Sequence, residues 1–198
     1  MAGASGEMSA GNGAAMRIAP LAFHLDPERP EHRQTIRDVC RITHHHEEAY
    51  AGALAILAAI RFMAFDNSSE PSTLLRHLVN YLPDSRVRDR ISSLSALPAA
   101  AGIAEVAGTF GATGHVVDSV PLALFAACAM SSQPLDAMLR GVIEAGGDTD
   151  TIASMTAQIS GARMGASQIP ARMIERLPDV GEIKRIVDDF ARTVRPVA

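Results

Sequence analysis

The sequence predicts an all-α protein with a single core, and three observations support this. Apolar residues recur at helical spacing almost throughout the 198 residues, and the pair Val116 and Val117 is too short to indicate a strand. Apolar residues make up 47% of the chain, but aromatic residues only 4%. Alanine and small aliphatic side chains must therefore fill the core. Prolines and glycines separate the apolar segments at intervals typical of helix ends.

Three helices are predicted in the first half of the chain. Pro30 suits the first turn of an amphipathic helix, whose apolar face comprises Ile36, Val39, Cys40 and Thr43. Residues 47–65 are apolar nearly all round and begin with acidic residues, which predicts a buried central helix. A third helix should follow Pro71 and end at Pro83.

Two shorter helices, separated by a proline, are expected within residues 84–107. The glycine-rich residues 108–119 predict a loop. We expect Asp118 or Ser119 to cap the helix that follows, with Pro121 in its first turn.

The predicted helix 134–145 should end at Gly146 and Gly147. In the next helix, Gly161 and Gly165 are one turn apart, which predicts close approach of a neighbouring helix. Two more helices, PARMIERL and GEIKRIVDDFARTV, complete the chain.

Charge and composition exclude several classes of protein. Eighteen basic residues against 22 acidic ones give a net charge of -4, which disfavours binding to duplex nucleic acid. Cys40 and Cys128 are far apart in apolar surroundings and are expected to be reduced core residues. We expect no apolar run long enough to cross a membrane, and residues 1–13 lack the order of a secretion signal. A cytoplasmic protein with a flexible segment at residues 1–10 is therefore expected.

The loop Gly146 to Thr151 concentrates oxygen ligands between two predicted helices. Asp148 and Asp150 are two residues apart, and the paired glycines allow a tight turn. Such oxygen ligands suit Mg²⁺ or Mn²⁺ better than Zn²⁺. The same residues are also typical of a helix N-cap. Capping and metal binding both remain open from spacing alone.

Two further segments contain candidate binding residues. Gly11, Asn12 and Gly13 precede a short helical segment and could expose backbone N–H groups to an anion, although Asn-Gly is also a common turn. Successive residues on a helix point about 100° apart, so at most one histidine of the run 44–46 should line a site. His115 in the glycine-rich loop is another candidate.

Four segments together resemble the ADP-ribosylglycohydrolase family over essentially the whole chain, from Gly11 to the helix after Ile169 and Pro170. They are GNGAAMRIAPLAF, the pair Thr43-His44 followed by EAYAGALA, GHVVDSVPLALFA and GGDTDTIASMTAQISGARMGASQIP. The resemblance implies a compact orthogonal helical bundle. It also implies hydrolysis of the glycosidic bond between ADP-ribose and a protein side chain or small acceptor, with two Mg²⁺ or Mn²⁺ ions.

The resemblance also implies roles for individual residues. Asp148, Asp150 and Thr151 match metal ligands of the family. Gly11 and Asn12 match the glycine-rich segment that lies against the ADP-ribose in the family. Ser9 matches a contact to its phosphates, and His44 matches the histidine at its ribose. No residue is assigned as catalytic.

The sequence departs from the family pattern because it contains no T-D-D-T motif. The adjacent pair Asp188 and Asp189 lies in an amphipathic segment without a flanking threonine, which indicates a solvated face. We therefore expect residues 1–198 to be a single partial domain, truncated at its N-terminus. Such a chain would be an enzyme completed by another polypeptide or by an upstream start, an ADP-ribose-binding module without turnover, or a remnant without a ligand. Its uncovered apolar flank would then be covered by a second copy or by a companion N-terminal fragment.

Overall fold

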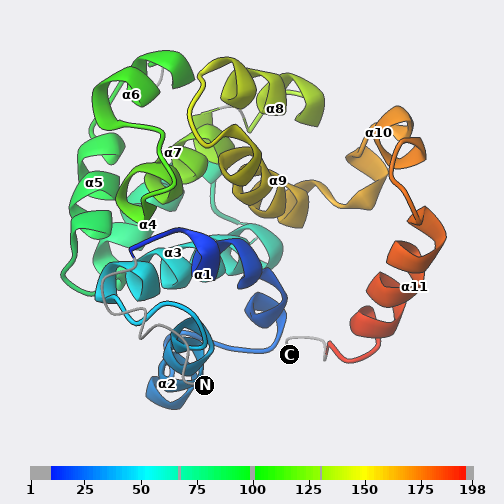
Figure 1. The fold of residues 1–198 in the computed structure, drawn as a ribbon, viewed down its shortest axis with the longest axis horizontal. Helices are drawn as coiled ribbons and strands as arrows, with labels where there is room; N and C mark the ends of the chain where they lie inside the picture. Colours follow the sequence, from blue (N-terminus) through cyan, green and yellow to red (C-terminus); the bar gives the residue numbers. More distant parts are fainter. Residues whose placement is uncertain (1–9, 67, 99–100, 130, 195–198) are drawn as a thin grey trace, which may run out of the picture.

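A computed structural model describes residues 10–66, 68–98, 101–129 and 131–194, and within them the chain is all-α, as predicted. No named strand occurs among these residues, and Gly11 and His115 form an isolated bridge. Figure 1 shows the helices in order along the chain. They are α1 Gly13–Arg17, α2 Pro30–Arg41, α3 Glu47–Phe65, α4 Leu74–Tyr81, α5 Arg86–Ser95, α6 Ile103–Phe110, α7 Val116–Ala129, α8 Leu135–Glu144, α9 Thr149–Met164, α10 Ala171–Glu175 and α11 Val180–Ala191, with short 3₁₀ turns at Ala19–Phe23, Pro71–Thr73 and Ala166–Gln168.

The central element is α3, which has the bounds that the sequence predicted. It buries 14 of its 19 residues, and it packs against α1, α2, α7 and α9 (Figure 1). The expectation that no apolar segment could span a membrane is wrong for α3. This helix is long and apolar enough by length and composition, and 78% of its most apolar window is buried inside the protein, as in a core helix.

The predicted start of α7 is also wrong. The helix begins at Val116, so Asp118 and Ser119 lie inside it and Pro121 lies beyond its first turn. His115 takes the capping role instead, because its Nδ1 accepts a hydrogen bond from the Val117 N–H at 3.2 Å. The remaining predicted helices occur within a few residues of their expected bounds.

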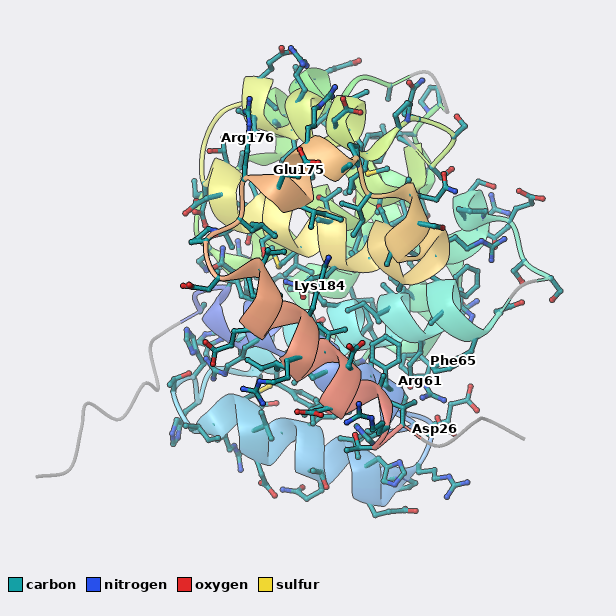
Figure 2. The ribbon with its side chains drawn as sticks, turned by 90° about the vertical axis from the view of Figure 1, so that its right-hand side faces the viewer. Asp26, Arg61, Phe65, Glu175, Arg176 and Lys184 are labelled. Atoms are coloured by element: carbon teal, nitrogen blue, oxygen red, sulfur yellow. The ribbon has the colours of Figure 1, made fainter. Side chains whose placement is uncertain are left out.

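At its C-terminal end the described chain leaves the bundle. Figure 2 shows α11, which carries Lys184, running across the outer face of the molecule. The Phe190 ring contacts the rings of Phe23 and His24 at centroid distances of 6.1 and 5.3 Å. No residue of α11 is buried, and its exposed aliphatic side chains are Ile183, Ile186 and Val187. An uncovered apolar face was expected from the sequence, and the polypeptide that would cover it remains a prediction.

Candidate functional site

Backbone hydrogen bonds bring three loops together at the N-terminal ends of α1, α7 and α9. The Val116 N–H donates to the Ala10 carbonyl at 2.9 Å, and the Asn12 N–H donates to the Gly114 carbonyl at 3.2 Å. The Asp148 N–H donates to the Ala112 carbonyl at 2.7 Å. The loop of residues 111–115 is therefore held between the Gly-Asn-Gly segment and the acidic loop. Three segments that the sequence analysis selected separately form one site.

The contact between the loop of residues 111–115 and the acidic loop requires a glycine. Gly147 has φ +81°, in the left-handed region, and a Cβ atom there would lie 2.1 Å from the Ala112 carbonyl oxygen. Its neighbour Gly146 also has a positive φ, +79°, but a Cβ there would meet nothing within 4 Å. Gly146 is therefore required for conformation alone, and Gly147 for conformation and for close approach.

A buried polar cluster joins the three loops through side chains. The Asn12 Nδ2 group donates to Asp148 Oδ2 at 2.7 Å and to Ser119 Oγ at 3.1 Å. The Ser119 hydroxyl in turn donates to the His115 carbonyl at 3.1 Å. Asn12 and Ser119 are 8% and 0% exposed, so these hydrogen bonds are largely shielded from water. The amide of Asn12 thereby fixes the orientation of the Asp148 carboxylate.

Ser119 was not identified as a site residue from the sequence, which suggested a role as a helix cap. A hydroxyl within the otherwise apolar run SVPLALFAACA was the available signal. Because a buried hydroxyl needs a partner, such a residue indicates a polar contact made by that face of the helix.

The geometry bears on the two interpretations of the acidic loop. Asp148 occupies the N-cap position of α9, but its side chain makes no capping hydrogen bond and turns instead towards Asn12. Asp150 is exposed in the first turn of α9, and the Thr151 side chain is buried. Asp148 therefore does not cap α9 with its side chain.

The oxygen atoms of Asp148, Asp150 and Thr151 are of the kind that Mg²⁺ and Mn²⁺ prefer. The described residues contain no group of three or more histidine, cysteine or acidic side chains placed to hold a metal ion. Two carboxylates and a hydroxyl fit such an ion in kind, but they are fewer than the roughly six ligands it takes. Water or another polypeptide segment would have to supply the rest.

The histidine run lies in the connection between α2 and α3 rather than on a helix, so the argument from helical spacing does not apply to it. His45 is exposed, and His46 caps α3 by accepting a hydrogen bond from the Glu48 N–H at 3.1 Å. The ring of His44 lies against Gly13, where an added Cβ would be 2.9 Å from its Cε1 atom. Of the three histidines, His44 is therefore the one beside the Gly-Asn-Gly segment.

Other predicted contacts are absent or fall outside the described residues. The Asn12 N–H is hydrogen-bonded to Gly114, so the idea that this amide is free for an anion is wrong. Ser9 lies outside the described residues. His115 is half-buried, and its Nδ1 is occupied as the cap of α7.

Asp118 has a supporting position that the sequence did not indicate. Its carboxylate accepts a hydrogen bond from Thr113 Oγ1 at 2.7 Å and lies 4.0 Å from the Arg90 guanidinium. A Cβ at Gly111, which has φ +92°, would be 2.9 Å from the carboxyl carbon of Asp118. This contact ties the loop of residues 111–115 to α7.

Asn12→Asp tests the polar cluster, because it replaces the donor to Asp148 by a second carboxylate. We expect a loss of about 1.5 kcal/mol of stability at pH 7, from the lost hydrogen bonds and from repulsion between like charges. Urea unfolding at pH 7 measures the loss. The matched control Asn80→Asp, at an exposed position of α4, should change stability by less than about 0.5 kcal/mol; an equal effect of the two variants would contradict the cluster.

His44 should titrate below its ordinary pKa of 6.5, because burial and then the nearby Arg17 charge disfavour its protonation. The unfolded chain then binds more protons than the folded one in this range. The contribution of His44 to stability is therefore present above pH 6.5 and is lost as the pH falls through the folded pKa. Nuclear magnetic resonance titration of the His44 ring measures this directly. Arg17→Met should restore the pKa only in part, since burial is the larger cause; full restoration would show that the charge dominates.

Comparison with known proteins identifies the family. A family model described as ADP-ribosylglycohydrolase matches residues 1–197. An uncharacterized protein of Archaeoglobus fulgidus is 30% identical over 171 residues, which cover 84% of this chain and 53% of that protein. ADP-ribosylhydrolase ARH3 of Xenopus tropicalis is 28% identical, covering 83% of this chain and 55% of that protein. Human ADP-ribosylhydrolase ARH3 is also 28% identical, with 84% and 53% covered.

A solved structure titled ADP-ribosylglycohydrolase-related protein complex has the same fold. Its TM-score is 0.73 at 23% identity, and the match covers 96% of this chain and 62% of the other. The chain spans about half the length of the curated relatives it matches.

Proposed function

Because the chain belongs to the ADP-ribosylglycohydrolase family, we propose that it hydrolyses the glycosidic bond between ADP-ribose and a protein side chain or a small acceptor. The observation that carries this proposal is the hydrogen bond from Asn12 to Asp148, which links two segments that resemble the family's substrate and metal segments. The two relatives named ADP-ribosylhydrolase support the same class of reaction.

The proposed roles follow from the positions of the side chains. Asp148, Asp150 and Thr151 would hold one or two Mg²⁺ or Mn²⁺ ions, and Asn12 keeps the Asp148 carboxylate turned towards the site. Such ions supply positive charge that stabilises the leaving group and orients a water molecule. His44, whose lowered pKa keeps it neutral at pH 7, can accept or donate a hydrogen bond to a ribose hydroxyl beside Gly13. No described side chain is assigned as the catalytic base.

A binding module that takes up ADP-ribose without hydrolysing it is the second candidate. It is favoured by the small number of carboxylates around Asp148 in the described residues. With few ligands the affinity for the metal would be low, and the ion would then depend on oxygen atoms of the nucleotide sugar.

The experiment measures ADP-ribose release from proteins modified on arginine or on serine, with and without Mg²⁺ or Mn²⁺. In parallel, calorimetry measures binding of free ADP-ribose. We expect metal-dependent release that Asp148→Asn abolishes and that the exposed control Asp188→Asn leaves unchanged. Binding that needs Asp148 but gives no release would establish the binding module in place of the enzyme. The absence of both release and binding would contradict both proposals.

A further inference from the structure

A cavity of about 440 Å³ lies at the end of α7 opposite to the candidate site. Its wall is formed by residues at the start of α4, the end of α5 and the end of α7, including Phe125 and Cys128. The candidate site meets α7 at its first residues, Val116 to Ser119. Because α7 rises about 1.5 Å per residue over 14 residues, about 20 Å separates its two ends. The cavity is therefore distinct from the candidate site.

The polar part of the cavity wall consists of one guanidinium, which only donates, and of hydroxyls, which can donate or accept. Arg76 is the one charged side chain among the described lining residues, and no ion pair or hydrogen bond of its guanidinium occurs within the described chain. The hydroxyls of Ser72 and Ser131 are likewise not engaged there, whereas that of Ser95 donates to the Ser92 carbonyl at 2.7 Å. The beginning of one helix and the ends of two others meet at this point, so the helix dipoles leave a partial negative charge of about half an elementary charge, which the full positive charge of Arg76 outweighs.

The rest of the wall is apolar. Leu75, Leu94 and Phe125 are buried and face the cavity together with Leu97. Cys128 is 9% exposed, and burial raises the pKa of its thiol to about 12. A ligand that pairs with Arg76 can therefore place an apolar body against this surface and cover the Cys128 sulfur.

We propose that this cavity binds a small amphiphilic anion, with its carboxylate at the Arg76 guanidinium and its aliphatic body against Phe125 and Leu94. The volume lies within the range of small-molecule sites. A divalent cation would find no carboxylate in the described wall, and a polyphosphate would meet a single guanidinium. One negative charge with a medium-length aliphatic chain matches both halves of the wall.

Octanoate is the probe, and calorimetry together with alkylation of Cys128 by iodoacetamide is the measurement. We expect octanoate to bind and, at saturation, to slow the alkylation of Cys128 at least about tenfold, as measured by peptide mapping. Cys40, which is buried beside α3 and outside this cavity, reports the slowing that comes from overall stabilisation alone, so alkylation of Cys128 should be slowed more than that of Cys40. Octan-1-ol and inorganic phosphate, which each match half of the wall, should bind at least about tenfold more weakly.

Arg76→Gln should weaken octanoate binding at least about tenfold, because it removes the charge-assisted hydrogen bond. Arg76 and the control residue Arg140 are both exposed on helices, so neither substitution should unfold the protein. Arg140→Gln, outside the cavity, should bind octanoate like the unmodified chain. Equal affinity of the two variants, no protection of Cys128, or equally tight binding of octan-1-ol or phosphate would each overturn the proposal.

Discussion

Gly147→Ala should lower the free energy of unfolding by about 3 to 5 kcal/mol, because it combines backbone strain with overpacking. The backbone at Gly147 has φ +81°, and the added Cβ would meet the Ala112 carbonyl oxygen at 2.1 Å. That carbonyl also accepts the hydrogen bond from the Asp148 N–H. The substitution should therefore displace Asp148 as well as destabilise the fold. Chemical denaturation measures the loss of stability, and ADP-ribose calorimetry measures the loss of the site.

Gly146→Ala is the matched control for this prediction. Its φ of +79° is nearly the same, but the added Cβ meets nothing within 4 Å. It should cost about 1 kcal/mol from strain alone. If the two alanine variants lost equal stability, close approach of the two loops would not be the reason for Gly147.

Gly52→Ala should destabilise the protein by about 3 kcal/mol. A Cβ at this position of α3 would lie 2.2 Å from Val116 Cγ2 and 3.3 Å from Val120 Cγ2. Both valines are fully buried in α7, and a β-branched side chain has few alternative rotamers, so neither can move aside. Thermal and urea unfolding measure the effect. The substitution Gly52→Ala should also shift Val116 and the loop of residues 111–115 that precedes it.

Gly161→Ala in α9 should have the opposite sign. No atom lies within 4 Å of the added Cβ, and alanine is the better helix former. We expect a gain of about 0.5 to 1 kcal/mol. A loss of stability would show that something packs against Gly161 in solution.

These glycines show where sequence reasoning succeeds and where it fails. The spacing of Gly161 and Gly165 predicted a close helix contact, but nothing lies against either residue, and Gly165 instead ends α9 with φ +74°. The close contact occurs at Gly52. Its neighbours in the sequence are mostly alanines, so one more small residue does not stand out there as a signal of close packing. Close approach depends on which helix lies opposite, and local spacing does not contain that information.

The elements themselves were largely predictable. Apolar periodicity with proline and glycine at the ends gave α2, α3, α4 and α8 nearly as observed, because these signals act within a few residues. The start of α7 was not, since a histidine ring caps it in place of the expected Asp118 or Ser119.

The candidate site was predictable in its members but not in its connections. Resemblance selected Asn12 and Asp148, and the structure joins them directly. The hydrogen bond between Asn12 and Ser119 could not be predicted from the sequence, because it depends on how α7 lies relative to α1. A capping side chain and a side chain aimed across the molecule have the same local sequence, so only the fold distinguishes the two for Asp148.

The hydrogen bond between Asn12 and Asp148 joins residues 136 positions apart in the chain. A site that depends on it cannot exist in any partly folded form in which α1 or α9 has separated from α3. Contacts of such long range carry a loop-closure cost that contacts between neighbouring segments avoid. Any molecule bound there would bind only the completed chain, and it would raise the unfolding temperature of the whole protein by an amount that grows with its free concentration relative to its dissociation constant.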